Sequence, residues 1–374
     1  MSPAHIIGWG KYVPEQVLTN ADLAQRIDTS HEWIIARTGV SERRIAAEGE
    51  TTSSMAIQAS WAALAAAGAS PAELDLIIVA TATPDYIFPA TACLVQDALG
   101  ATHAAAFDLS AGCTGFVYAL GVAADMISAK DRPGSTGAAL VIGAETLSRI
   151  TDWTDRATCV LFGDGAGAVV LRRDDSEGGV LSTVLGADGS GGDLLSMPAG
   201  GSAEPCSHRT VSERRHFIRM RGREVFRFAA RAMPEATQRA LEQADLTVSD
   251  LALLIPHQAN ERILDAAARA LNLPTELVYS NVARYGNTSA ASIPIALCEA
   301  VEEGLVQRDD VIVCVGFGAG LTWGATAVRW SVPLPGRPPS PWRTLRYRLL
   351  QAYAMARSFA LRALRYIFSR GLGE

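Results

Sequence analysis

Cys113 is the first candidate for chemistry, and it lies in Phe107-Asp108-Leu109-Ser110-Ala111-Gly112-Cys113-Thr114-Gly115-Phe116. The segment runs from a strand-like end through small residues into a helical pattern over residues 116–127, so we expect the cysteine at a strand-to-helix junction. A helix N-terminus favours a thiolate, and the small neighbours leave room for a substrate near the backbone. The alternative is a small buried cysteine that does no chemistry.

Two polar side chains, His257 and Asn287, are the next candidates. His257 follows the apolar run 251–255, and ligands usually meet an open α/β sheet at strand ends. A histidine there can donate a hydrogen bond to a substrate oxygen or exchange a proton with it, and the alternative is a core or turn histidine. Asn287 lies in a turn of small polar residues, where its amide could hold a developing oxyanion without changing charge. The alternative for Asn287 is a helix N-cap or an Asx-turn.

Two glycine clusters, 163–167 and 316–320, punctuate the apolar runs. Neither is followed by the Lys and Ser/Thr of a phosphate loop, and neither has the context of a dinucleotide fingerprint. Tight turns are the default interpretation of both. The second cluster could also aim backbone N–H groups at a reacting carbonyl oxygen.

Short apolar runs predict buried strands, and alanine-rich stretches with helical periodicity lie between them. Alternation of this kind is typical of a layered α/β architecture. The predicted strands are Leu76–Ala80, Ala139–Ile142, Ala166–Leu171, Leu251–Ile255, Val311–Val315 and Gly324–Val328, and the clearest helices are Ser53–Ala67 and Arg227–Ala244.

A weak internal repeat indicates a duplicated unit. Residues 63–64 and 240–241 are both Ala-Leu, and each pair leads over the same interval to an apolar run, at 74–78 and at 251–255. The constant offset of 177 residues is close to half the chain. Chance similarity between ordinary helix–strand units is the alternative.

Composition excludes several classes of protein. The chain has 374 residues, a formal net charge of −6 and 49% hydrophobic residues, which is an ordinary globular balance and disfavours a general nucleic-acid binder. Its six cysteines show no C-x-x-C pair and no ligand-like spacing, so neither a disulfide scaffold nor a metal site is expected. We see no export signal and no apolar run that would span a bilayer, and therefore expect a cytoplasmic protein.

The last forty residues differ from the rest. Residues 335–374 contain eight arginines and one acid, so the preceding 334 residues carry −13. Five prolines between 333 and 341 predict a stiff linker, and the absence of proline and glycine from 342 to 369 predicts one long helix. On a helical wheel, one face holds Trp342, Leu345, Leu349, Tyr353, Leu364 and Ile367, and Arg343, Arg346, Arg357 and Arg365 lie towards the other. We expect this segment to be an appendage outside the core. One interpretation is a helix packed on the dimer or a partly ordered extension, and the other is a basic amphipathic helix that lies on an anionic membrane surface.

Together, Cys113, His257 and Asn287 with their surroundings resemble the β-ketoacyl-ACP synthase III family of the thiolase-like superfamily. The resemblance covers about residues 4–332. It includes Thr29-Ser30-His31-Glu32-Trp33-Ile34-Ile35-Ala36-Arg37-Thr38-Gly39, Pro256-His257-Gln258-Ala259-Asn260, Gly286-Asn287-Thr288-Ser289 and the glycine-rich end. It implies a thiolase-like α/β fold in which two duplicated halves form a layered α-β-α-β-α core, with the C-terminal basic amphipathic helix added. The expected division is 1–173 with Cys113, 174–332 with His257 and Asn287, and a linker and arginine-rich helix over 333–374.

The resemblance also implies the chemistry. Cys113 would be acylated by an acyl-CoA, and His257 with Asn287 would bind the thioester carbonyl of malonyl-ACP as CO₂ leaves. Backbone N–H groups of Cys113 and Ala319 would form an oxyanion hole. No cofactor is expected, because decarboxylation drives the bond formation.

Substrate and partner residues follow from the same resemblance. Homodimers are expected, with Phe88 closing the partner's acyl pocket. The residues expected to bind substrate are Thr29, Trp33, Arg37, Phe88, Arg156, Gly222, Phe226 and Asn260, and those expected to meet the carrier protein are Arg223, Arg227 and Arg262. Solvated surface arginines are the alternative for the last three.

Three positions depart from the commonest family pattern. Gly112 stands where alanine is frequent, Ala319 stands where glycine is usual, and Arg223 stands where a neutral amide is common. These changes leave the pocket size and one CoA contact open. An acyltransferase, or a condensing enzyme of specialised metabolism that uses another acceptor, is the rival function. A carrier-binding protein without activity is a third, and the intact Cys113, His257 and Asn287 disfavour it.

Overall fold

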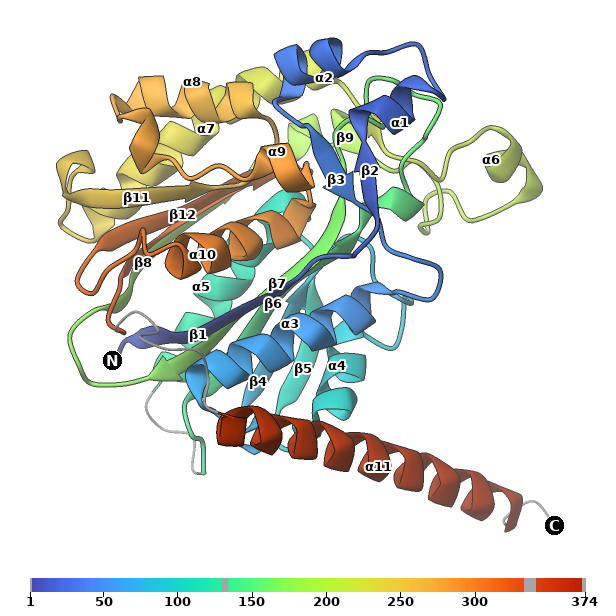
Figure 1. Cartoon of the computed structure of the whole chain (residues 1–374), viewed down its shortest axis with the longest axis vertical. Coiled ribbons are helices and arrows are strands. Elements are labelled where there is room, and N and C mark those ends of the chain that lie inside the picture. The colour runs from blue at the N-terminus through green and yellow to red at the C-terminus, as the bar shows by residue number, and fades with distance from the viewer. Residues whose placement is uncertain (1, 130–133, 333–340, 372–374) are drawn as a thin grey trace.

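The computed structural model describes residues 2–129, 134–332 and 341–371. The core of the described chain contains two β-sheets, which helices separate and flank (Figure 1). The first sheet has the order β1 (Ala4–Tyr12), β7 (Asp164–Arg173), β6 (Ala138–Thr146), β4 (Leu76–Ala80) and β5 (Ala105–Leu109). The second has the order β11 (Leu251–Pro256), β12 (Val311–Gly318), β13 (Thr322–Arg329) and β8 (Gly179–Ala187).

Helices complete five layers around these sheets. Helices α3 (Thr52–Ala67) and α4 (Thr91–Leu99) cover the outer face of the first sheet, and α7 (Gly222–Gln243) and α8 (Glu261–Leu271) cover the outer face of the second. Between the sheets lie α5 (Gly115–Ser128) and α10 (Ser292–Glu302). The structure therefore confirms the predicted α-β-α-β-α core.

Alternation along β4 shows why the first sheet is apolar on both faces. Leu76, Ile78 and Ala80 join the cluster between the sheets, whereas Ile77 and Val79 join the cluster under α3 and α4. A strand that lies between two helical layers must be hydrophobic at every position. This explains the uninterrupted apolar run in the sequence.

Shorter elements surround the two sheets. They are β2 (Val17–Thr19), β3 (Glu42–Arg44), β9 (Leu195–Ser196), β10 (Arg219–Met220), α1 (Asn20–Ala24), α2 (His31–Thr38), α6 (His208–Ser212) and α9 (Val282–Tyr285). Short 3₁₀ turns include η1 (Pro71–Glu73), η2 (Gly112–Thr114), η5 (Val248–Asp250), η6 (Thr275–Leu277) and η7 (Ser289–Ala291).

All six predicted strands and both predicted helices are confirmed, with ends that differ by a few residues. The structure also confirms the 177-residue repeat. The succession α3–η1–β4 corresponds to α7–η5–β11, and the two 3₁₀ turns begin 177 residues apart, at Pro71 and Val248. Strands β1 and β8 were not predicted. Both pair antiparallel with a neighbouring strand, and their sequences contain polar and glycine residues that interrupt an apolar run.

The predicted C-terminal helix is confirmed as α11 (Pro341–Gly371), but the expectation that it stands apart from the core is wrong. It packs against α3 and α4 through Tyr347 and Ala354, which are buried. The Tyr347 hydroxyl donates to the carbonyl oxygens of Leu64 and Ala69, both at 2.8 Å. Most of the predicted linker, residues 333–340, lies outside the described residues.

The apolar face predicted for α11 is not the face that packs. Buried Tyr347 and Ala354 define the contact stripe, and Ser358 and Arg362 extend it with bonds to Asp97 of 2.6 and 3.0 Å. The predicted apolar residues lie on the opposite side and are exposed: Trp342, Leu345, Leu349, Tyr353, Leu364 and Ile367. The side chains that pack against α3 and α4 are therefore small or amphipathic, namely Tyr347, Ala354 and Ser358.

The Tyr347 hydroxyl should stabilise the docked helix. Tyr347→Phe removes the donor to two buried carbonyl groups, so we expect the free energy of unfolding to fall by about 1–2 kcal/mol and Tm to fall by a few degrees. Tyr353→Phe is the matched control, because that tyrosine is 70% exposed on the same helix, and its Tm should not change. Thermal unfolding followed by circular dichroism measures both. Equal Tm values for the two variants would contradict the docking described here.

Candidate active site

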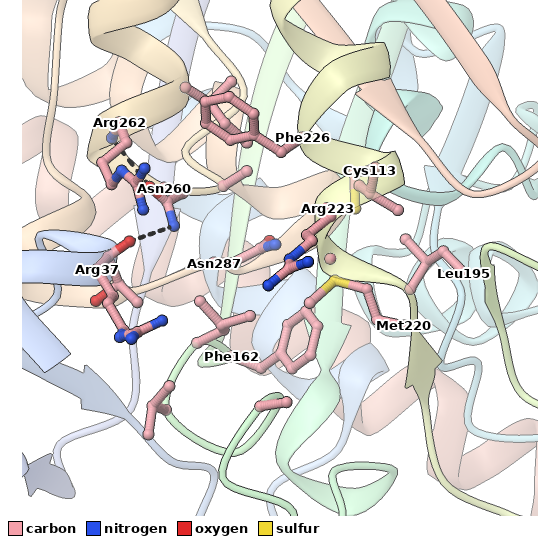
Figure 2. Close-up of a pocket in the computed structure, with 18 of the residues that line it drawn as sticks. Arg37, Cys113, Phe162, Leu195, Met220, Arg223, Phe226, Asn260, Arg262 and Asn287 are labelled. Atoms are coloured by element: carbon pink, nitrogen blue, oxygen red, sulfur yellow. Dashed lines mark hydrogen bonds between the residues drawn. The ribbon is translucent and has the colours of Figure 1, made fainter. Parts of the chain in front are cut away.

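A cavity of about 770 Å³ reaches from the protein surface to Cys113, His257 and Asn287. The structure thus brings together the three residues predicted to do chemistry, although they come from different segments of the chain. Figure 2 shows Cys113 and Asn287 in this cavity. Nine further predicted residues line the same cavity: Trp33, Arg37, Arg156, Gly222, Arg223, Phe226, Arg227, Asn260 and Arg262.

Cys113 lies in η2, between the end of β5 and the start of α5, as the sequence predicted. Its backbone touches the second sheet at the end of β12, where a Cβ added to Gly318 would stand 2.6 Å from the Cys113 nitrogen. Only glycine fits at this contact.

The expected thiolate is not the resting form of Cys113. Burial raises the pKa of the thiol to about 12, and a hydrogen bond with Ser289 offsets only part of that effect. Desolvation disfavours the charged form more than the helix N-terminus favours it. The thiol is therefore protonated before substrate arrives, and its proton must go elsewhere when it reacts.

His257 follows β11 directly and is buried beside Phe317, whose ring centroid is 5.3 Å away. Burial lowers the pKa of His257 to about 3, so the imidazole is neutral near pH 7. Its Nδ1 lies 2.6 Å from the Ser292 hydroxyl, and the same hydroxyl oxygen accepts from the Gln258 N–H at 3.4 Å. This arrangement directs the Ser292 proton to Nδ1, which places the imidazole proton on Nε2 and makes Nε2 a donor.

Asn287 is fixed by its own backbone. Its N–H donates to the Leu161 carbonyl at 2.8 Å, and its carbonyl accepts from the Gly163 N–H at 3.0 Å. The side-chain Oδ1 accepts from the Ser289 N–H at 2.8 Å, which is the Asx-turn considered for this residue. The turn uses only the side-chain oxygen and leaves the Nδ2 donors for a substrate. Asn287 can therefore form an Asx-turn and also donate to an oxyanion.

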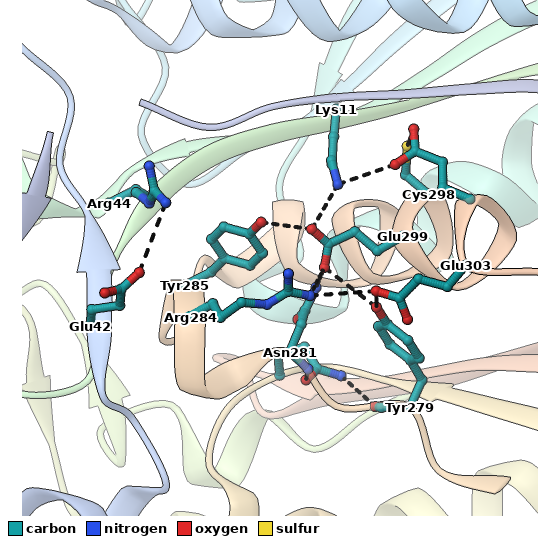
Figure 3. A network of polar contacts seen from close by, with 12 residues as sticks. Lys11, Glu42, Arg44, Tyr279, Asn281, Arg284, Tyr285, Cys298, Glu299 and Glu303 are labelled. Atoms are coloured by element: carbon teal, nitrogen blue, oxygen red, sulfur yellow. Dashed lines mark hydrogen bonds and ion pairs between the residues drawn. The ribbon is translucent and has the colours of Figure 1, made fainter. Parts of the chain in front are cut away.

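A buried carboxylate anchors the segment before Asn287 (Figure 3). Glu299 of α10 accepts from Lys11 of β1 at 2.7 Å and from the Tyr285 hydroxyl at 2.6 Å. Asn281 and Arg284 add bonds of 2.9 and 2.7 Å. Burial opposes ionisation of Glu299, but these donors outweigh it and lower its pKa. The network ties α9 to α10, which is bonded in turn to β1, and so positions the turn that holds Asn287.

Trp33 lies at the cavity wall in contact with two arginines. The guanidinium groups of Arg37 and Arg156 lie 4.6 and 4.7 Å from the centroid of its ring. Arg156 is held by the Asp28 carbonyl oxygen at 2.7 Å. Flat cationic and aromatic groups of this kind provide stacking surfaces for a planar ligand.

Asn260 forms hydrogen bonds within the chain. Its Oδ1 caps α8 by accepting from the Arg262 N–H at 2.9 Å, and its Nδ2 donates to the Arg37 carbonyl at 3.0 Å (Figure 2). These bonds join α8 to α2 across the cavity mouth. Arg262 lies over Phe226, with 5.6 Å between its guanidinium carbon and the ring centroid.

Three predicted residues do not line the cavity. Phe88 is 84% exposed on the loop before α4, and the Thr29 hydroxyl is buried with no hydrogen-bond partner among the described residues. Ala319 lies behind Cys113, and a Cβ added to Gly112 would stand 3.0 Å from the Ala319 nitrogen and 3.2 Å from its Cβ. An alanine at position 112 would therefore crowd Ala319, and it would also be strained because Gly112 has φ +52°. The glycine at 112 thus leaves space for the alanine at 319.

Ser289, Ser292, Phe317 and Glu145 were not predicted as site residues. Serine is common at helix starts, and a phenylalanine within an apolar run gives no sign of a ring partner, so the sequence offered no specific signal. Within the described residues, no cluster of three His, Cys, Asp or Glu side chains could hold a metal ion, and no helix is long and apolar enough to cross a membrane.

Comparison with known proteins identifies the family. The models of 3-oxoacyl-[acyl-carrier-protein] synthase III and of its C-terminal part match residues 107–189 and 241–330. The β-ketoacyl-[acyl-carrier-protein] synthase III of Natranaerobius thermophilus is 52% identical over 333 residues, which are 88% of this chain and all of that protein. The chain belongs to the β-ketoacyl-ACP synthase III family.

Solved structures agree with this assignment to the synthase III family. The 3-oxoacyl-[acyl-carrier-protein] synthase III of Aquifex aeolicus superposes with a TM-score of 0.80 at 50% identity, and covers 87% of this chain and all of that one. The priming β-ketosynthase of the R1128 polyketide pathway gives 0.81 at 38% identity, over 89% of this chain and 97% of that one. Residues 331–374, which include α11, lie beyond both family-model matches.

The Ser292 hydroxyl should orient His257 in this synthase. Ser292→Ala frees the imidazole to rotate and removes its tautomer partner, so we expect kcat for the condensation to fall about 10–100-fold. Ser212→Ala, on exposed α6, is the control and should keep kcat. Steady-state assays with acyl-CoA and malonyl-ACP measure both, and partial recovery in Ser292→Thr would identify the hydroxyl. An unchanged kcat in Ser292→Ala would show that packing alone fixes the ring.

Proposed function

We propose that this protein catalyses the decarboxylating Claisen condensation of an acyl-CoA starter with malonyl-ACP. The products are β-ketoacyl-ACP, CoA and CO₂, and the reaction initiates fatty-acid or related acyl-chain synthesis. The observation that supports it best is the meeting of Cys113, His257 and Asn287 in one cavity of a synthase III fold.

The first half-reaction uses Cys113. Its sulfur attacks the thioester carbonyl of the acyl-CoA, and CoA leaves. The backbone N–H groups of Cys113 and Ala319 belong to two turns in contact, so we assign the oxyanion hole to them. Because backbone donors are rigid, they stabilise the tetrahedral oxyanion without reorganising.

The second half-reaction uses His257 and Asn287. Nε2–H of His257 and Nδ2–H of Asn287 are the donors that the local bonds leave for the malonyl thioester carbonyl. Negative charge develops on that oxygen as CO₂ leaves, so neutral fixed donors stabilise the transition state more than the ground state. The carbanion then attacks the acyl-Cys113 carbonyl. This chemistry uses decarboxylation as its driving force and requires no cofactor.

Acyl-CoA would enter along the cavity from its mouth. We assign the adenine to the Trp33, Arg37 and Arg156 group, where one guanidinium must move to admit it. Gly222 and Phe226 would border the pantetheine, and Asn260 would shape the mouth through its bond to Arg37 and offer the second N–H of its Nδ2 to the substrate. Thr29, next to Asp28, would add its unpartnered hydroxyl.

Carrier protein would dock beside the same mouth. Arg223, Arg227 and Arg262 line it and are exposed, so an acidic partner meets local positive charge on an acidic enzyme.

A homodimer would complete the acyl pocket. Tyr86, Ile87 and Phe88 are 59%, 86% and 84% exposed in one subunit. Three adjacent apolar side chains at a loop tip are costly in water, and insertion into a partner subunit would bury them.

We also propose that the enzyme works in the cytoplasm at a membrane surface, which α11 contacts through residues 342–369. Its outward face exposes Trp342, Leu349 and Tyr353 by 80%, 62% and 70%. Exposed Arg346 and Arg348 flank this face, and α11 contains no acid. A second copy of the helix would set positive charge against positive charge, whereas an anionic bilayer offers complementary charge and a place for the apolar side chains.

Intact-mass spectrometry tests the reaction. After incubation with a panel of acyl-CoAs, we expect one acyl mass gain that is absent in Cys113→Ala, and native spectra should show two chains. Malonyl-ACP should then clear the acyl group and release a β-ketoacyl product. Acylation that malonyl-ACP does not clear would indicate another acceptor, as in the rival acyltransferase. Failure of every acyl-CoA to acylate Cys113 would overturn the proposal.

Vesicle cosedimentation tests the membrane contact. The protein should pellet with phosphatidylglycerol-containing vesicles, and Leu349→Glu with Ile367→Glu should weaken binding at least about tenfold, because two buried apolar groups are lost. Leu305→Glu is the matched control, since Leu305 is 49% exposed on the body and should not affect binding. Equal binding by the double variant would refute the contact. Loss of the dimer in that variant would instead assign the face to a second copy.

A further inference from the structure

The proposed oxyanion hole needs two backbone N–H groups from different parts of the molecule at a fixed separation. One belongs to Cys113 in η2, which follows β5 of the first sheet, and the other to Ala319, which lies between β12 and β13 of the second sheet. Steric contact limits how closely the two turns approach, since a Cβ added to Gly112 would stand 3.0 Å from the Ala319 nitrogen. Such a contact does not prevent the turns from separating, so an attractive interaction is also needed.

Thr322 supplies an interaction of this kind. It is the first residue of β13, and its hydroxyl oxygen lies 3.0 Å from the Ala111 carbonyl oxygen and 3.0 Å from the Ala319 carbonyl oxygen. Ala111 directly precedes η2, and Ala319 directly follows β12. One side chain therefore bridges the two turns. Each acceptor peptide is the neighbour of the peptide that carries a proposed N–H donor.

Thr114 completes the bridge from the side of the nucleophile. It is fully buried in η2, and its hydroxyl oxygen lies 3.0 Å from the Thr322 hydroxyl oxygen. Carbonyl oxygens only accept, so the single Thr322 hydroxyl proton is directed to the carbonyl groups of Ala111 and Ala319. The Thr114 hydroxyl is then the donor between the two threonines. The Ala111 carbonyl oxygen also accepts from the Thr114 N–H at 3.2 Å, which closes the turn around Cys113.

An ordinary threonine pair lies farther along the same strand. The hydroxyl oxygens of Thr183 and Thr326 are 3.2 Å apart and join β8 to β13 within the second sheet, as cross-strand pairs commonly do. Neither residue lines the cavity. The pair of Thr114 and Thr322 differs, because it joins η2 to β13 and because its carbonyl acceptors belong to the turns on either side of the proposed oxyanion hole.

We propose that Thr114 and Thr322 are positioning residues that form a hydroxyl bridge, which holds the N–H groups of Cys113 and Ala319 at the separation that an acyl oxyanion requires. The inference rests on the proposed function and deepens it, since it assigns two residues that are not expected to touch the substrate. Both threonines act through the backbone of the two turns. The bridge adds no covalent step and moves no proton.

The bridge acts on some steps of the reaction and not on others. Acylation of Cys113 passes through a tetrahedral intermediate whose oxyanion lies between the two backbone N–H groups. Attack on acyl-Cys113 during condensation forms a second intermediate of the same kind. Decarboxylation of malonyl-ACP instead places negative charge on a thioester oxygen held by His257 and Asn287, which have no hydrogen bond to the bridge. Loss of the bridge should therefore slow acylation and spare decarboxylation.

Thr322→Val tests this difference, because valine keeps a branched side chain and removes the hydroxyl. Rapid-quench mass spectrometry with saturating acyl-CoA should show acylation at least about tenfold slower than in wild type, since a small displacement weakens fixed donors. The acyl-CoA concentration that gives half of the maximal rate should change less than about twofold. Release of CO₂ from malonyl-ACP without a starter, in which water protonates the carbanion, should also change less than about twofold.

Thr326→Val is the matched control. It removes a buried threonine hydroxyl from the same strand together with a comparable hydrogen bond between two threonines. Its Tm should fall by a few degrees, as in Thr322→Val, but its acylation rate should match wild type. Thr322→Ser restores the hydroxyl and should recover acylation to within about threefold of wild type. Thr114→Val loses the donor to Thr322 and keeps the bonds to the two carbonyl groups, so it should slow acylation less than Thr322→Val does.

Several results would overturn the bridge. Unchanged acylation in Thr322→Val would show that contact between the turns is sufficient. Equal slowing of acylation and decarboxylation, equal slowing in Thr326→Val, or no recovery in Thr322→Ser would assign Thr322 to packing alone. If Thr322→Val does not fold, Thr114→Val provides the same comparison of acylation with decarboxylation. Failure of the wild-type enzyme to be acylated would refute the proposed function instead, so the two failures are distinguishable.

Discussion

The contact between two backbone turns, 112–113 and 318–319, is the constraint on which the site depends. The first turn ends a strand of one sheet and the second ends a strand of the other, and a Cβ at Gly318 would stand 2.6 Å from the Cys113 nitrogen. This contact sets the distance between the two halves at the nucleophile. It also places two backbone donors side by side, so the same steric requirement joins the sheets and forms the proposed oxyanion hole. The exchange of glycine and alanine at 112 and 319 keeps the fit.

Burial then determines the electrostatics of the site. Cys113 and His257 are neutral near pH 7, because desolvation raises the pKa of the thiol and lowers that of the imidazole. A site of neutral donors binds developing negative charge strongly, since little water competes for it. The cost is that the protons of these two buried groups do not leave easily. Glu299 shows the opposite case, because the donors around it, among them Lys11 and Arg284, lower its pKa and keep a buried carboxylate ionised.

The C-terminal helix illustrates a limit of amphipathicity. The wheel separated one strongly apolar face from an arginine-rich one, and the apolar face would ordinarily be the one that packs. Instead α11 contacts α3 and α4 through Tyr347, Ala354 and Ser358, because these side chains fit a surface that also offers carbonyl acceptors at Leu64 and Ala69. Hydrophobicity identified the faces correctly but not their partners. The residues that remain exposed are those proposed to meet the bilayer.

The sequence by itself determined the local elements and the identity of the reacting groups. Apolar runs such as Leu76–Ala80 marked strands because both of their faces are buried, and motifs around Cys113, His257 and Asn287 identified the family. Only the tertiary structure decided how these groups behave. The protonation of Cys113, the donor nitrogen of His257 and the docking face of α11 all depend on desolvation and on contacts between residues far apart in the chain. Such quantities are properties of an environment, and a local pattern of residues does not specify the environment.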